Sequence, residues 1–254
     1  MTRRPVLVPA LAFTGLLATA ACSATGADHA AADRATPAPH GTGATGAPAS
    51  AVSALTPAQA QAALLTQADL GAPWTATQGA ATWRDGLLKA SASASSPDCQ
   101  RLMDALYTDQ LLGAAAAPHA TVALDDGTDE AQLRQQVTTG RPADVDRTLD
   151  WLRSLPRTCG HFTATTTSYG VQDVQVAEFP LPALGDAREA LRVTLTGQPE
   201  DADAVPMVLT LDVAAVRVGD DALTLSDGTL GTPAGTLQQA AQVGTQRLTA
   251  VRRH

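Results

Sequence analysis

Residues 207–226, MVLTLDVAAVRVGDDALTLS, decide the fold. The segments 207–218 and 222–226 are rich in valine, leucine and threonine and partly alternate in polarity, which is typical of strands. Val218-Gly219-Asp220-Asp221 joins them and is typical of a tight turn. The sequence therefore predicts an antiparallel hairpin in the last third of the chain.

The same β-branched character predicts further strands upstream of this hairpin. They are expected at residues 120–124, 133–139, 162–167, 174–179 and 190–196. The alternation in 133–139 is weak, so a helix remains an alternative there. The short stretches that contain Trp74 and Trp83 also fit strands.

Helices are predicted from their start signals and their apolar spacing. Thr56-Pro57 supplies an N-cap and a first-turn proline for a helix that reaches Leu65, with a second turn from Gln67 to Gly71. Pro97 and Pro142 open two more, and a last helix begins near residue 234. The apolar positions of these three are Leu102, Met103 and Leu106, then Val145, Leu149 and Leu152, then Leu237, Ala241, Gly244, Leu248 and Val251. The class is α+β, an antiparallel sheet with helices packed on it, with a cleft as an open option.

The N-terminal residues indicate export. Arg3 and Arg4 precede an apolar run from Val6 to Leu17, and the small residues that follow lead to Cys22. The run is too short for a membrane-spanning helix, which needs about 20 apolar residues. Residues 1–21 are therefore predicted to be a signal peptide. Export by the general or by the twin-arginine route remains open.

Cys22 ends a segment that resembles the bacterial lipobox. Thr19-Ala20-Ala21-Cys22 carries the resemblance, although leucine is usual where Thr19 stands. The resemblance implies a lipidated Cys22 that anchors the chain to the outer face of the cell membrane. Ordinary signal cleavage, with Cys22 at this place by accident, is the alternative.

Residues 22–54 predict a flexible tether. Alanine, glycine, threonine and proline dominate there, and such a composition cannot bury enough apolar surface to fold. Its GTGATG at 41–46 matches a dinucleotide-binding pattern but lacks the flanking strand and helix. Residues 55–254 then form the predicted globular domain.

Two cysteines remain in that domain, Cys99 and Cys159. An even number in an oxidising compartment predicts one disulfide between them. Its loop of about 60 residues would stabilise the fold by roughly 4 kcal/mol on the chain-entropy account. Two unpaired buried thiols are the alternative.

The mature chain is acidic. Without Arg3 and Arg4, 15 basic residues face 25 acidic ones, which gives a net charge of −10. This balance argues against nucleic acid as a partner and against binding to anionic lipid through basic patches.

No residue pattern in the domain indicates catalysis, and no cofactor or metal is predicted. His119 and His161 lack carboxylates at ligand spacing, and no nucleophile elbow occurs. The acidic run from Asp125 to Glu130 fits either a solvated turn or a calcium site, without the EF-hand spacing. The aromatic residues are expected mainly in the core, with Trp74, Trp83 and Tyr169 as candidates to line a ligand cleft.

Several short motifs resemble the sensor domain outside actinobacterial kinases of the PknH type, which also stands alone in lipoproteins. They are residues 64–71 (LLTQADLG) with Trp74, Pro97-Asp98-Cys99, 149–159 with Phe162, Leu184-Gly185-Asp186, and Val216-Arg217-Val218-Gly219. The resemblance covers nearly all of 55–254 and implies an antiparallel sheet with helices around a cleft for a small ligand. The kinase domain has two disulfides, whereas this chain has one cysteine pair. The family offers no catalytic motif.

These observations predict a membrane-anchored extracytoplasmic lipoprotein whose domain binds a small ligand or an envelope protein without catalysis. Two other classes remain open. A cell-envelope hydrolase would place His119 or His161 beside a serine or a carboxylate in a deep cleft. An interaction protein would have no small-molecule pocket and would expose an apolar patch.

Overall fold

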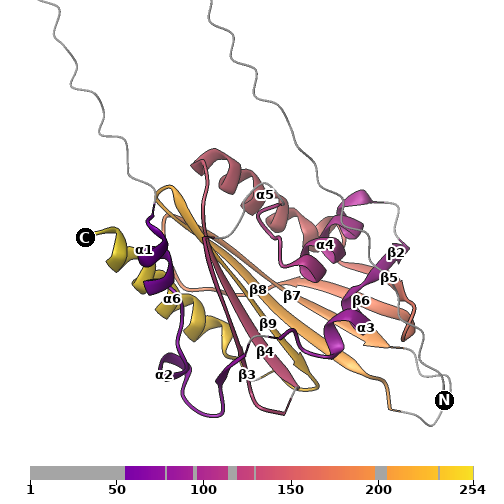
Figure 1. Cartoon of the computed structure of the whole chain (residues 1–254). Helices are drawn as coiled ribbons and strands as arrows, with labels where there is room; N and C mark the ends of the chain where they lie inside the picture. The colour runs from indigo at the N-terminus through magenta and orange to yellow at the C-terminus, as the bar shows by residue number, and fades with distance from the viewer. Residues whose placement is uncertain are drawn as a thin grey trace, which may run out of the picture. The chain divides into compact units, whose positions relative to one another are not determined.

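The predicted hairpin lies at the centre of the sheet in the computed structural model (Figure 1). Its strands are β8 (Val208–Val218) and β9 (Asp221–Leu230), paired from Leu209↔Leu230 to Val218↔Asp221. Gly219 has φ +61° at the first position of the two-residue turn, where type II′ turns favour glycine. The structure describes residues 55–77, 79–93, 96–113, 119–128, 130–197, 205–233 and 235–253. The signal peptide, Cys22, the tether with its GTGATG and residue 254 lie outside these ranges.

Within these ranges the sheet has nine strands, each antiparallel to its neighbours, in the order β1-β3-β4-β9-β8-β7-β6-β5-β2. The other strands are β1 (Thr75–Thr77), β2 (Ala90–Ser93), β3 (Ala120–Asp125), β4 (Ala131–Thr139), β5 (His161–Thr166), β6 (Gly170–Glu178) and β7 (Ala187–Gly197). Because all neighbours in the sheet are antiparallel and helices pack on it, the predicted α+β class is confirmed.

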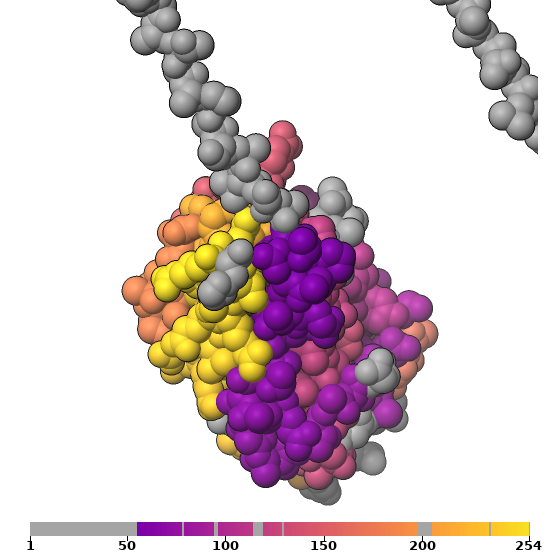
Figure 2. Space-filling view, turned by 60° about the vertical axis from the view of Figure 1, so that its left-hand side comes forward, coloured from indigo at the N-terminus to yellow at the C-terminus, as the bar shows by residue number. Residues whose placement is uncertain are grey.

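Helices cover both faces of the sheet. They are α1 (Pro57–Ala62), α2 (Gln67–Leu70), α3 (Trp83–Leu88), α4 (Pro97–Thr108), α5 (Pro142–Thr158) and α6 (Leu237–Arg252). Buried residues of α3, α4 and α5 form one core with the sheet, the α5-side core, and those of α1 and α6 form another on the opposite face, the α6-side core. Figure 2 shows α6 in yellow beside α1 and α2 in indigo and purple.

The alternation of β8 explains why both faces need helices. Leu209, Leu211 and Val213 point into the α5-side core, whereas Ala214 and Val216 belong to the α6-side core. A strand that is buried on both faces carries apolar residues at odd and at even positions, so its sequence alternates only partly between apolar and polar residues.

The helix starts follow the predicted signals. Thr56 and Gln59 form a capping box at α1, and Ser96 caps α4 ahead of Pro97. Pro142 opens α5 at its first turn. The apolar faces predicted for α4, α5 and α6 are buried, apart from a half-buried Val251.

Some boundaries predicted from the sequence are wrong. Helix α1 ends at Ala62, so Leu64 and Leu65 are buried in a loop rather than in a helix. Trp83 begins helix α3 rather than lying in a strand, and the edge strand β2 was not predicted. The alternative of a helix for residues 133–139 is excluded because β4 contains them.

One segment supplies both edges of the sheet. β1 pairs with β3 at one edge and β2 pairs with β5 at the other, yet only residues 78–89 separate β1 from β2. Eight strand spacings make a flat sheet about 38 Å wide. The six-residue helix and the extended residues on either side of it span at most about 36 Å, and the chain must also rise over the side chains of the sheet. The sheet is therefore curved, with α3 on its concave face.

Trp83 anchors this crossing at the middle of the sheet. Its ring lies over Gly228 of β9, where an added Cβ would overlap the indole. The neighbouring backbone is held by Gln132 of β4, whose amide accepts from the Ala81 N–H at 3.2 Å and donates to the Gly79 carbonyl at 3.2 Å. Glycine at position 228 is thus required for the crossing chain to approach the sheet.

Gly228→Ala is expected to lower the free energy of unfolding by about 1–3 kcal/mol, because overpacking displaces the Trp83 ring. Chemical denaturation monitored by tryptophan fluorescence measures the change. Gly197→Ala is the matched control, since its Cβ would make only ordinary contacts of 3.6 Å or more with Met207. Equal stabilities of the two variants would contradict the role of Gly228.

Candidate ligand-binding groove

An open groove of about 650 Å³ lies on the concave side of the sheet, beside the N-terminal half of α5. One wall is α5, the opposite wall comes from α4 and the loop after it, and the end of β4 forms the floor. The lining residues are Arg101, Leu112, Thr138, Thr139, Gly140, Arg141, Asp144, Val145, Arg147, Thr148 and Asp150. This volume is within the range of small-molecule sites.

The two helical walls are fixed to each other. Cys99 in α4 and Cys159 after α5 form the predicted disulfide, with Cα atoms 5.5 Å apart. The indole N–H of Trp151 in α5 donates to Asp98 Oδ1 in α4 at 3.0 Å. The Arg101 guanidinium stacks on the Trp151 ring, 3.8 Å from its centroid. A covalent bond, a hydrogen bond and a cation–π contact therefore hold α4 against α5.

The floor is also ordered by hydrogen bonds. Thr139 Oγ1 donates to Asp221 Oδ1 at 2.8 Å, and the Gly140 N–H donates to the Asp220 carbonyl at 2.9 Å. Asp221 is fully buried and forms an ion pair with Arg252 of α6. The groove floor is thus connected to the helix on the other face of the sheet.

Arginine dominates the charge of the groove. The side chains of Arg141 and Arg147 are 83% and 71% exposed, and both pair with the Asp144 carboxylate. Hydrogen bonds from Arg141, and then from Arg147, lower the pKa of Asp144 below its usual value. Asp144 therefore stays ionised and is unsuited to act as a general acid, which needs a raised pKa.

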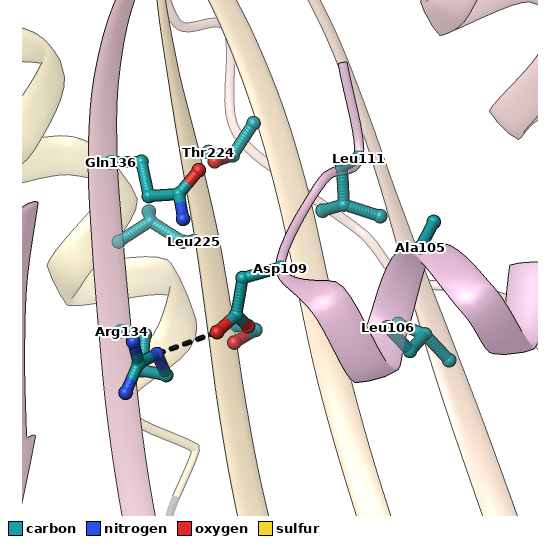
Figure 3. A pocket seen from close by; sticks show the side chains of 9 residues that line it. Ala105, Leu106, Asp109, Leu111, Arg134, Gln136, Thr224 and Leu225 are labelled. Carbon is teal, nitrogen blue, oxygen red and sulfur yellow. Dashed lines mark ion pairs between the residues drawn. The ribbon is translucent and has the colours of Figure 1, made fainter. Parts of the chain in front are cut away.

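A small pocket lies nearby, at the C-terminal end of α4 (Figure 3). Asp109, with φ +55° just after α4, pairs with Arg134 of β4 at 2.7 Å and with Arg84 of α3 at 2.8 Å. Burial lowers the pKa of Arg84, although Asp109 opposes the shift. The cavity of about 10 Å³ has room for about one water. This cluster fastens α3 and α4 to the sheet rather than forming a ligand site.

A buried pair of acids lies on the other face, near the start of α6. Asp212 and Asp227 are opposite each other in β8 and β9. Arg192 binds both oxygens of Asp212 at 2.6 Å, whereas Asp227 Oδ1 has no hydrogen-bond partner among the described residues. Burial, followed by the charge of Asp212, raises the pKa of Asp227 to about 7, although the Leu237 N–H donates to it.

The aromatic residues predicted for a cleft do not line this groove. Trp74 is buried in the α6-side core and Trp83 in the α5-side core, whereas Tyr169 is 40% exposed and lies against Gly86. Sequence reasoning missed Arg101, Arg141 and Arg147. They come from α4, from the residue just before α5 and from α5, and only the fold brings them together.

The other candidates are separate from the groove. His119 and His161 are exposed, each at the start of a strand, and neither lines it. The Asp125 and Asp126 carboxylates accept from the Gly127 and Thr128 N–H groups, which is the hydrogen bonding of a solvated turn. Among the described residues, no three His, Cys, Asp or Glu side chains are grouped to hold a metal ion. No helix in the described ranges is long and apolar enough to cross a membrane.

Solved structures offer weak matches. The chain is similar to the extracellular domain of PknH from Mycobacterium tuberculosis, at 15% identity over 80% of this chain and 100% of that chain, with a TM-score of 0.46. A hypothetical protein from Helicobacter pylori matches at 11% identity over 47% of this chain and 83% of that chain, with a TM-score of 0.27. No family model and no curated protein matches the chain.

Asp227→Asn is expected to stabilise the protein at pH 8 and to change little near pH 4. The folded pKa of Asp227, about 7, is above its usual value of 3.8. The stability contributed by neutral Asp227 is therefore fully present below pH 4 and is lost progressively as the pH rises from about 4 to 7. At pH 8 the gain is at most about 4 kcal/mol. Urea unfolding across this range measures it, with the exposed Asp85→Asn as the charge-matched control. A pH-independent difference would contradict the assignment.

Proposed function

We propose that this protein is a lipid-anchored extracytoplasmic binding protein that holds a small ligand in the groove beside α5 without catalysis. The observation that carries the binding half of the proposal is the groove itself, about 650 Å³ between two cross-linked helices. Rigid walls favour binding because little side-chain or loop entropy is lost when the ligand enters. The anchoring half rests on Cys22 and the residues before it.

The lining of the groove favours binding over hydrolysis. Its lining residues include no histidine, serine or cysteine, so the Ser–His and Cys–His pairs of a nucleophile and a base have no candidates there. Its two carboxylates are held by arginines, Asp144 by Arg141 and Arg147, and Asp150 by Arg153 at 2.7 Å. A glycosidase-type pair needs one protonated acid, which the lowered pKa of Asp144 opposes.

Cys22→Ser is expected to release the protein from membranes, because the lipid-bearing thiol is lost. Wild-type chain and variant are expressed in a bacterial host that processes lipoproteins, and each is followed by fractionation. Mass spectrometry of the N-terminal peptide should show a lipid on Cys22 in the wild type. An unmodified N-terminus at another residue would overturn the anchoring.

Gly140→Phe is expected to abolish ligand binding while leaving the fold intact. A Cβ at position 140 would make an ordinary contact of 3.5 Å with Val145, so the ring would occupy the groove. A thermal-shift screen of sugars, organic phosphates, carboxylates and fatty acids identifies compounds that raise the Tm of the wild type. Those compounds should raise the Tm of Gly79→Phe, a substitution in an open loop, but not that of Gly140→Phe.

If no compound raises the Tm of the wild type, or if the two phenylalanine variants respond alike, the groove is not a small-molecule site. An interaction protein then becomes the better interpretation.

A further inference from the structure

The groove has a net positive charge, whereas the chain as a whole has a net negative charge. The whole sequence has 25 acidic and 17 basic residues, whereas three arginines and two aspartates line the groove. Asp150 is moreover paired with Arg153, which is not a lining residue. A local excess of positive charge on an acidic protein raises the local concentration of anions.

Arg101 is the most available of the three guanidiniums. It is exposed and has no ion-pair partner among the described residues. Its stacking on Trp151 uses the face of the guanidinium, which leaves the N–H groups at the edge for a ligand. Because Trp151 is itself fixed by Asp98, this cation is held in place before a ligand arrives.

Arg141 and Arg147 already converge on one anion. Arg141 Nε donates to Asp144 Oδ2 at 2.7 Å, and Arg147 donates to the other oxygen of the same carboxylate. Each guanidinium has five N–H groups, so most of them remain available to a second anion. The two arginines are therefore within reach of one anionic group in the groove.

We propose that the groove binds a small molecule through a phosphate monoester held by Arg101, Arg141 and Arg147. This inference rests on the proposed binding function and names its ligand class. A phosphate monoester offers three acceptor oxygens and nearly two negative charges, which suits three guanidiniums better than a carboxylate does. The organic part of the ligand would contact Leu112 and Val145.

The same phosphate chemistry has two sources, a soluble organic phosphate or the headgroup of a phosphomonoester lipid. The test uses the folded protein with its disulfide intact. Isothermal titration calorimetry measures binding of inorganic phosphate, glycerol 3-phosphate and, as the uncharged reference, glycerol. Sedimentation with phosphatidylcholine vesicles, with and without phosphatidic acid at nine to one, measures binding to the lipid headgroup.

Arg101→Gln and Arg147→Gln are each expected to weaken glycerol 3-phosphate binding by at least about tenfold, because each removes a charge-assisted hydrogen bond. Arg157→Gln is the matched control. It removes the same charge from the exposed last turn of α5, outside the groove, and should leave binding unchanged. Arg101→Lys retains the charge and should recover part of the affinity. Higher salt should weaken wild-type binding.

The outcomes separate this inference from the proposed function. Soluble phosphates that bind wild type but not the groove variants support a soluble ligand, and binding confined to phosphatidic acid vesicles supports a lipid headgroup. If Arg157→Gln weakens phosphate binding as much as the groove variants do, the proposed site is wrong. If phosphates do not bind, but another compound raises the Tm of the wild type and not that of Gly140→Phe, the ligand class is wrong and the groove remains a binding site. If phosphates do not bind and no other compound distinguishes the wild type from Gly140→Phe, both proposals are overturned.

Discussion

The crossing of the sheet by residues 79–89 is the constraint on which the rest of the structure depends. It joins the two edge strands of a curved sheet through one short segment. The crossing chain also positions the groove. Arg84 of α3 donates to the carbonyls of Leu106 and Tyr107 near the end of α4 at 3.0 and 3.2 Å, and it pairs with Asp109. The wall that carries Arg101 is therefore fixed through α3 to the middle of the sheet.

Arginine has two distinct uses in this fold. Away from the groove, arginines neutralise buried aspartates: Arg192 pairs with Asp212, and Arg252 pairs with Asp221. Truncating one partner of such a pair would leave an uncompensated buried charge, so these arginines are structural. In the groove, by contrast, exposed guanidiniums outnumber the carboxylates that face them, and Arg101 stacks on an indole instead of an acid. The groove differs from the interior because its cations are not fully neutralised by the protein.

The sequence predicted the centre of the fold better than its periphery. The hairpin of β8 and β9 is readable because apolar segments rich in valine, leucine and threonine flank a glycine turn, and α5 because its apolar positions recur at helical spacing over about two turns. Trp83 was placed wrongly because a six-residue helix has little local signal, and its position depends on Gly228, 145 residues later in the chain. The groove was missed for the same reason: Arg101 is 40 residues from Arg141, and their charges read as ordinary solvated helix faces.

The cysteines connect location to binding. The bond between Cys99 and Cys159 fastens the start of α4 to the end of α5, the two helices that form the walls of the groove. Such a bond persists only in an oxidising compartment, and the export predicted from residues 1–21 would deliver the chain there. In a reducing compartment, Trp151 and its contacts with Asp98 and Arg101 would have to align the walls alone. Under the proposed function, the export signal therefore does more than localise the protein, because the groove attains its cross-linked form only after export.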